Sequence, residues 1–201
     1  MIHDAARIIK REHDSLAAVL HALLYLVEQI NKGRWQPDFE LLRTMLRYVD
    51  DFPEKLHHPK EDSHLFSALR MRAPEAGPVL GELEAEHREG VQRMHELNDA
   101  LKSYEQHGAG GYHAFADAVR RYVDFEWQHM RKEDEVLLPL AEQKLTATDW
   151  RTIDTAFKAN TDPLSGATPD DEMDALFHRI AALAPAPIGW NLPMRSRKMP
   201  E

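Results

Sequence analysis

The sequence predicts an all-α protein, an antiparallel up-down-up-down four-helix bundle with a short helical C-terminal extension. Helix-forming residues dominate the chain, whereas glycine accounts for only 9 of its 201 residues. Apolar residues recur at intervals of three and four along four long stretches. The pattern His-x-x-Lys-Glu-Asp-x-x-Leu of residues 57–65 returns at residues 129–137. The chain therefore divides into two similar halves, and four long helices with short connections should stack antiparallel.

The first half predicts two helices. The apolar stripe of the first helix covers residues 2–29, and Asn31-Lys32-Gly33 follows it as a helix stop. The second helix runs from residue 39 towards residue 69. Pro53 and Pro59 lie within this second helix. Because proline removes a backbone donor, we expect a kink or a local break near the first copy of the repeated pattern.

The second half predicts two more helices. An apolar line that includes Val91 traces the third helix over residues 80–101, and the glycine-rich residues 108–111 end it. The fourth helix covers residues 115–140, with Val136 in its stripe. In both helices a histidine falls within the apolar line.

The character of the chain changes after the fourth helix. We expect residues 1–145 to form the bundle and residues 146–201 to form an extension packed on it. Thr148-Asp149-Trp150 is typical of the capped start of a short helix that ends near Lys158. A second short helix is expected over residues 170–183, followed by a proline-rich tail. Two short helices cannot bury a core of their own, so the extension should rest on the bundle.

The composition excludes several classes of function. A formal net charge of −9 argues against a nucleic-acid or anionic-membrane partner, which is usually met by clustered positive charge. The chain has no cysteine, so any metal must be held by nitrogen and oxygen ligands. Neither a signal-peptide pattern nor a stretch long and apolar enough to cross a bilayer is found, and we therefore expect a cytoplasmic protein.

The repeated pattern places possible ligands in pairs. In each copy a histidine is followed four residues later by a glutamate, and residues at this spacing share one face of a helix. Each copy is preceded, at nearly the same distance, by a Glu-His pair that adds one more histidine. The six predicted metal ligands are His13, His57, Glu61, His87, His129 and Glu133.

Four imidazoles and two carboxylates at one place predict a metal centre. We expect each half to give one ion two histidines, while the two glutamates bridge both ions. This mixture of ligands in a helical bundle favours a non-haem di-iron centre, with zinc or manganese as substitutes. Each ion would keep open positions for water, dioxygen or another small ligand.

The order of these ligands resembles the hemerythrin-like family, also called HHE cation-binding. The phrases that carry the resemblance are His57-His58-Pro59-Lys60-Glu61-Asp62 and Arg131-Lys132-Glu133-Asp134, and the matching residues span roughly 1–145. The resemblance implies a four-helix bundle with a non-haem di-iron centre. It also implies the same six ligands, one histidine from each of the four helices and one glutamate from each of the second and fourth.

The sequence departs from the oxygen-carrying members of this family on the third helix. The carriers have His-x-x-x-His there, whereas the residue four after His87 is Val91. The missing histidine opens a coordination position, so the resemblance is closer to bacterial proteins implicated in repairing iron centres under nitrosative stress and to iron- or oxygen-sensing domains. His58 is a better candidate for an additional ligand than His95, which is rotated off the ligand face. Asp134 is another candidate, because it matches the carrier-type His-x-x-x-x-Asp spacing.

Other polar residues of these helices have simpler interpretations. We expect Lys60, Asp62 and Lys132 to lie on the solvated helix surface, and His64 to be a core residue or to support the ligands. The remaining histidines that we expect at the surface are His3, His21, His107, His113 and His178.

A rival ligand set lies in the same segments. Glu54, Glu84 and Glu126 each precede a predicted histidine by three residues, which is the Glu-x-x-His spacing of ferritin-like di-iron proteins. That architecture also needs lone glutamates on the two other helices, and the first helix offers His13 in the central position. We therefore rank it below the hemerythrin-like set and give these glutamates the role of acceptors that orient the imidazoles.

These observations lead to one expected function and two alternatives. We expect a protein that binds or reacts with dioxygen, peroxide or nitric oxide, in oxidative or nitrosative stress response or in iron-centre repair. One alternative is an oxygen or iron sensor or carrier without turnover, and the other is a bundle whose metal is structural. The choice between enzyme and binding protein stays open, as does a protein partner or a homodimer.

Overall fold

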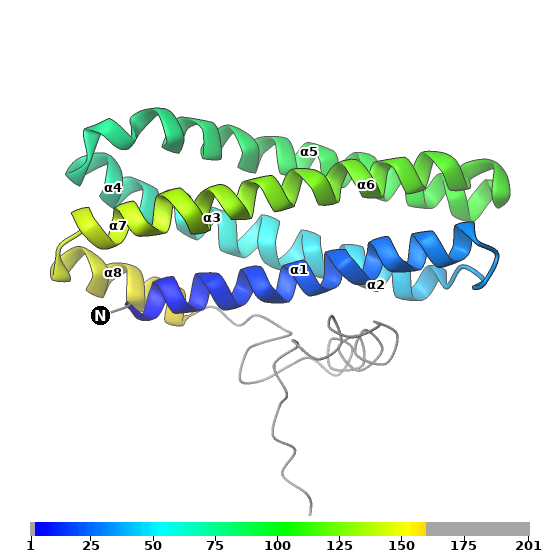
Figure 1. Cartoon of the computed structure of the whole chain (residues 1–201), viewed down its shortest axis with the longest axis horizontal. Coiled ribbons are helices and arrows are strands. Elements are labelled where there is room, and N and C mark those ends of the chain that lie inside the picture. The colour runs from blue at the N-terminus through cyan, green and yellow to red at the C-terminus, as the bar shows by residue number, and fades with distance from the viewer. Residues whose placement is uncertain (1–2, 160–201) are drawn as a thin grey trace, which may run out of the picture.

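The described part of the protein is an all-helical bundle. The computed structural model describes residues 3–159, and every regular element within them is a helix. Figure 1 shows the long helical segments side by side, with α8 (Ala147–Lys158) beside the start of α1 (Asp4–Asn31). Across these residues no helix is both long enough and apolar enough to span a membrane. The second short helix predicted at residues 170–183, and His178 with it, lie outside the described residues.

The first half consists of α1 and a long segmented helical rod. Gly33, with φ +64°, follows the end of α1, as the predicted helix stop requires. Asp38 caps the next helix by accepting a hydrogen bond from the Leu41 backbone N–H at 3.0 Å. The rod then runs through α2 (Phe39–Val49), η1 (Asp50–His57), α3 (His58–Lys60), η2 (Glu61–Phe66) and α4 (Ser67–Arg72).

The second half repeats this plan. After the short 3₁₀ helix η3 (Pro74–Ala76), the remaining segments are α5 (Gly77–His107), α6 (Ala109–Lys132), η4 (Glu133–Leu137) and α7 (Leu138–Lys144). The end of the third helix predicted at 108–111 is confirmed, because α5 ends at His107, but the connection is shorter than expected: Gly108, with φ +56°, separates α5 from α6. Gly111 serves packing instead, since a Cβ there would lie 2.6 Å from the Tyr104 Cα.

Two apolar clusters occupy the two ends of the bundle, and a polar layer separates them. Along α1, Ile9 belongs to one cluster and Leu16 to the other, while the buried Glu12 and His13 lie between them in sequence. The same succession recurs on α5, where the buried His87 lies between a leucine of one cluster and a methionine of the other. A buried layer of charged residues is costly unless its groups are paired or bind a cation, so this layer marks a candidate functional site.

The helices that carry the repeated pattern change their winding at this layer. The segments η1, η2 and η4 are π-helical, and the last two begin at Glu61 and Glu133. The expected break does not occur, because Pro53 lies inside η1, Pro59 lies in the first turn of α3, and the rod continues to α4. The alternative that was expected, a kink, stays a prediction. Wider π turns often occur at functional sites, because they re-aim side chains without ending the helix.

Two valines predicted in the apolar stripes lie on the surface. Val91 is 41% exposed, because its neighbour Gly90 takes the buried position on α5. Val136 is 48% exposed, because the extra residue in the π turn of η4 moves the buried position to Leu137. The 3.6-residue period fails at Val136, where the winding is π-helical, whereas the buried positions of α5 keep intervals of three and four and leave Val91 outside them.

The start of the predicted extension packs on the bundle as α8. Its cap is Thr146, which forms a capping box with Asp149, two residues earlier than the predicted start. Trp150 and Phe157 are buried in the same apolar cluster as the start of α1. His3, which we expected at the surface, is half-buried and stacks on Trp150 at 4.4 Å between ring centroids.

Candidate metal centre

The six predicted ligands come together in the polar layer. His13 lies on α1, His57 on η1, His87 on α5 and His129 on α6, whereas the two glutamates begin the π segments η2 and η4. All six side chains are buried, with exposures between 0% and 6%: His13, His57, Glu61, His87, His129 and Glu133. Helices far apart in the sequence therefore present them to one point.

The ligand atoms form two groups that share one residue. In each group the atoms lie within 4.8 Å of one another, and Glu61 belongs to both. One group contains His13, His57, Glu61 and Glu133. The other contains His58, Glu61, His87 and His129. The histidine pairs therefore divide between the groups as the two halves of the sequence predict.

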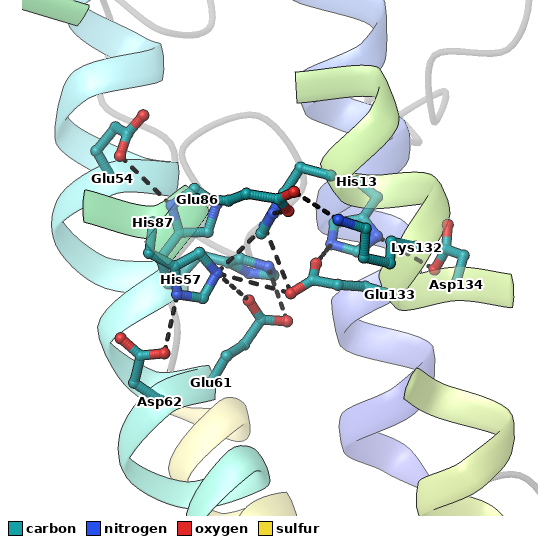
Figure 2. A network of polar contacts seen from close by, with 12 residues as sticks. His13, Glu54, His57, Glu61, Asp62, Glu86, His87, Lys132, Glu133 and Asp134 are labelled. Atoms are coloured by element: carbon teal, nitrogen blue, oxygen red, sulfur yellow. Dashed lines mark hydrogen bonds and ion pairs between the residues drawn. The ribbon is translucent and has the colours of Figure 1, made fainter. Parts of the chain in front are cut away.

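Both glutamates reach histidines from both halves of the chain, and Figure 2 shows their carboxylates pointing toward one another among the imidazoles. Glu61 places one oxygen 3.3 Å from His57 Nε2 and the other 3.7 Å from His87 Nε2. Glu133 places Oε2 3.2 Å from His13 Nε2 and Oε1 3.4 Å from His129 Nε2. Each carboxylate thus spans the gap between the two groups.

The atoms that face the centre are suited to cations. Both oxygens of Glu61, both oxygens of Glu133 and Nε2 of His57 are buried and make no hydrogen bond within the part of the chain that the structure describes. The Nε2 atoms of His87 and His129 are 3.1 Å apart. Two nitrogens that bind the same metal ion, each at roughly 2.0–2.1 Å from it, are about this far apart. The residues therefore fit a metal centre, because a cation satisfies atoms that otherwise remain buried and unpaired.

The opposite edge of each of the four imidazoles is held by a carboxylate. The Nδ1 of His57 bonds to Glu12 at 2.7 Å, and that of His129 bonds to Glu86 at 3.0 Å. Both glutamates come from the Glu-His pairs of the sequence, but only their histidines were assigned a role there. This pairing fixes the tautomer in which Nε2 is free to bind metal.

The other two imidazoles are held by aspartates from the repeated pattern. The Nδ1 of His87 bonds to Asp62 at 2.9 Å, so the prediction that Asp62 is simply solvated surface is wrong. The Nδ1 of His13 contacts Asp134 at 3.2 Å. This contact places the candidate ligand Asp134 outside both ligand groups. In both cases the aspartate follows a central glutamate and crosses to the neighbouring helix.

Two lysines of the repeated pattern also differ from the expected solvated surface. Lys132 is half-buried and donates hydrogen bonds to Glu82 and Glu86, the second of which holds His129. Lys60 is half-buried, and its Nζ donates to the Ala156 carbonyl of α8 at 3.2 Å. Lys132 is therefore bonded to a residue that holds a central histidine, and Lys60 joins the repeated pattern to α8.

The glutamates of the ferritin-like rival lie outside both ligand groups. Glu84 pairs with Arg70 near the surface. Glu54 and Glu126 are buried behind the imidazoles, where Tyr122 donates a hydrogen bond to Glu54 at 2.8 Å. Of the three, Glu54 contacts an imidazole, its Oε2 lying 3.4 Å from Nδ1 of His58. The orienting role expected for all three thus falls mainly to Glu12, Asp62, Glu86 and Asp134 instead.

The remaining candidate histidines differ in burial and in whether they belong to a ligand group. His58 is 4% exposed and belongs to the group of His87 and His129. His95 is exposed, and His64 is half-buried outside both groups.

The protonation of the cluster shows how its charges balance without a cation. Burial alone would lower the pKa of His13, but Asp134 and Glu133 raise it to about 9. Burial likewise opposes a charge on His87, but Asp62 and Glu133 raise its pKa to about 10. Burial and the neighbouring His87 hold the pKa of His58 well below its usual value. Imidazolium protons thus compensate the carboxylates, and cation binding would release them.

Comparison with known proteins gives one match. The family model described as Hemerythrin HHE cation binding domain matches residues 4–141, a span that contains both ligand groups and ends before α8. No curated protein and no solved structure matches the chain.

Proposed function

The chain belongs to the hemerythrin HHE cation-binding domain family, and from this premise we propose that it is a non-haem di-iron protein that binds or reacts with dioxygen, peroxide or nitric oxide. Its expected setting is oxidative or nitrosative stress response, or the repair of iron centres. Cation binding follows from the family and from the two groups of buried ligands, whereas the identity of the metal and its reactivity are the proposal.

One observation carries the choice of two ions. Glu61 belongs to both ligand groups, and Glu133 contacts His13 from one group and His129 from the other. Carboxylates that span two sets of imidazoles suit a pair of cations, and imidazole with carboxylate suits iron. One ion would be held mainly by His13 and His57, and the second mainly by the pair from the other half.

The antiparallel up-down-up-down topology belongs to the same proposal. It is supported by Figure 1, where the long segments follow one another side by side along the bundle. It is also supported by the repeated contacts, because the Glu-His pair of each half orients a histidine of its own half. A helical hairpin duplicated about an approximate two-fold axis accounts for both features.

Iron held in this way supplies redox chemistry and open positions for a small ligand. The protein's own residues hold and orient the imidazoles through their Nδ1 atoms. The apolar clusters on both sides of the layer exclude water from it. Val91 supplies no ligand, which favours reaction or sensing over simple reversible oxygen carriage. The number of open positions then depends on His58.

Anaerobic reconstitution tests the proposal. The metal-free protein is titrated with ferrous iron, the bound iron is counted, and the product is exposed in turn to oxygen, peroxide and nitric oxide while absorbance is followed. Two irons per chain and a spectral response to at least one ligand are expected. Multiple turnovers indicate an enzyme, whereas a reversible band or a single response indicates a carrier or sensor.

Matched variants test the ligand set. Glu61→Gln with Glu133→Gln is expected to abolish binding of the iron pair. Glu84→Gln is the control, because Glu84 also lies near a ligand histidine in the sequence but pairs with Arg70. If the pair survives the first double variant and is lost instead in Glu54→Gln with Glu126→Gln, the ferritin-like set is the correct one.

The structural alternative predicts a different result. A bundle whose metal is structural would hold zinc or manganese tightly and would give no response to any of the three ligands. The cytoplasmic location and a protein partner or homodimer stay predictions, as does the absence of nucleic-acid and membrane partners.

A further inference from the structure

His58 adds a third imidazole to the ligand group that contains Glu61, His87 and His129. Its ring stacks on His87 with 4.3 Å between centroids and an interplanar angle of 10°, and it meets His129 edge-on at 5.1 Å. The side chain is buried, and it belongs to the same compact group as Glu61. A core histidine without a role would need polar partners on both edges of its ring.

The outer edge of His58 faces a carboxylate. Its Nδ1 lies 3.4 Å from Glu54 Oε2, and neither atom makes a hydrogen bond to another group of residues 3–159. The other four imidazoles of the centre show the same arrangement, with a carboxylate at Nδ1 and Nε2 toward the middle. His58 therefore has the surroundings of a ligand, with Nε2 on the edge away from Glu54.

Glu54 is itself fixed from two other sides. Tyr122 Oη donates a hydrogen bond to its Oε1 at 2.8 Å. Gly90 of α5 leaves space for the carboxylate, because a Cβ at that position would lie 2.8 Å from Oε1. A buried carboxylate held in this way limits the positions available to the imidazole that it faces.

The internal repeat provides a natural comparison. The repeat relates residues 57–65 to residues 129–137, so Glu54 corresponds to Glu126 and His58 corresponds to Met130. Glu126 is as deeply buried as Glu54, but both of its oxygens lack a hydrogen bond. Met130 joins the apolar cluster instead. The acceptor occurs in both halves, whereas the imidazole occurs only in the first.

From these contacts we propose that His58 is a third imidazole ligand of the ion held by His87 and His129, and that Glu54, fixed by Tyr122, is the residue that positions it. The inference rests on the proposed function, because it needs the pair of ions. Its consequence is that the two ions are unequal, one with three imidazoles and the other with two. The ion of His13 and His57 would then keep more open positions than the ion of His58, His87 and His129.

The test uses the full chain and two metal probes. Ferrous iron and Co²⁺ are titrated anaerobically into the metal-free protein, stepwise affinities are obtained by competition with a chelator, and the visible spectrum of bound Co²⁺ reports its coordination. The variants are His58→Met, which copies the second half, Glu54→Gln and Tyr122→Phe. Glu126→Gln is the matched control, because it alters the equivalent carboxylate, whose oxygens make no hydrogen bond to an imidazole of the described residues.

The expected result is selective for one ion. Glu54→Gln should weaken the binding of one of the two ions about 10- to 100-fold, which is the usual effect of losing a supporting contact. His58→Met, which removes the proposed ligand itself, should weaken the same ion at least as much, and both variants should leave the other ion unchanged. Both variants should shift the Co²⁺ spectrum, Tyr122→Phe should shift it less, and Glu126→Gln should behave as wild type. Circular dichroism checks that each variant is folded, and Glu54→Gln carries the test if His58→Met is not.

Other outcomes overturn the inference. Unchanged affinities and spectrum in His58→Met would remove His58 from the ligands. Equal effects of Glu54→Gln and Glu126→Gln on the ion affinities and the Co²⁺ spectrum would show that the loss of any buried carboxyl group weakens metal binding. Glu54 would then not act by positioning His58. Wild-type protein that binds fewer than two ions would instead refute the proposed di-iron function itself, before any variant is compared.

Discussion

At the residue scale, each of the four predicted ligand histidines makes contacts through both of its ring nitrogens. Nε2 faces the shared glutamates, while Nδ1 is held by Glu12, Asp62, Glu86 or Asp134. The inner cluster of histidines and glutamates was predictable, because histidine and glutamate four apart in a repeated pattern share a helix face. The outer carboxylates were not, because Asp62 and Asp134 cross to other helices and a run of Lys-Glu-Asp usually marks a solvated face.

The first prediction concerns Asp62. Asp62→Asn replaces the carboxylate at His87 Nδ1 with an amide of the same shape. The imidazole is then less basic and less well oriented as a metal ligand. We expect about a 10-fold loss of affinity for the ion that His87 holds. Chelator competition measures it. Asp117→Asn, whose wild-type carboxylate pairs with Arg120 on the surface, is the control and should not change the affinity.

The second prediction compares two glycines of α5. Glycine within a helix usually costs about 1 kcal/mol relative to alanine, so Gly81→Ala, with nothing within 4 Å of the new Cβ, should raise stability by about that much. Gly90→Ala should not, because its Cβ would meet Glu54 Oε1 at 2.8 Å and displace the carboxylate. Urea unfolding of both variants measures the difference. A stability gain in Gly90→Ala equal to that of Gly81→Ala would show that Glu54 moves freely.

At the element scale, periodicity predicted the helices but not their winding. Helix ends marked by Gly33 and Asp38 agree with the sequence signals, because those residues act locally. The π segments could not be predicted, since they arise where several helices converge on the polar layer. The resulting change of register explains why Val136 faces solvent and Leu137 is buried.

The third prediction concerns α8 and pH. Hydrogen bonds from Arg72 and Thr146 hold the pKa of Asp149 below its usual value. A carboxyl with a lowered folded-state pKa contributes stability above its unfolded pKa, about 3.9, and that contribution is lost as the pH falls through the lower folded value. Hydrogen exchange of α8 amides should therefore be slower in wild type than in Asp149→Asn at pH 6. The difference should shrink as the pH falls below about 4, whereas a difference independent of pH would contradict the ionic origin.

At the scale of the whole molecule, the polar layer divides the core into two apolar clusters and joins all four long segments at one level. The sequence predicted this convergence from two similar halves. It did not predict how α8 would contribute, although α8 buries Phe157 with its ring 6.1 Å from that of His57. The family match ends at residue 141, so Phe157, which lies beside the candidate site, comes from outside the matched residues.

The fourth prediction couples metal binding to the stability of the bundle. Four carboxylate oxygens of Glu61 and Glu133 are buried without hydrogen bonds, so the metal-free layer carries an unfavourable term that cations remove. Free metal at 1,000 times its dissociation constant should stabilise the fold by about 4 kcal/mol for each site. Thermal unfolding with and without ferrous iron under anaerobic conditions measures this gain.

The double variant Glu61→Gln with Glu133→Gln separates binding at this layer from binding elsewhere. It removes the carboxylate partners of buried imidazoles, so without metal it should unfold at or below the temperature of the metal-free wild type. With metal, the wild-type midpoint should rise and the variant midpoint should not. Because the layer contacts every long segment, the rise should occur as one cooperative transition, and equal stabilisation of the variant would place the metal outside the two ligand groups.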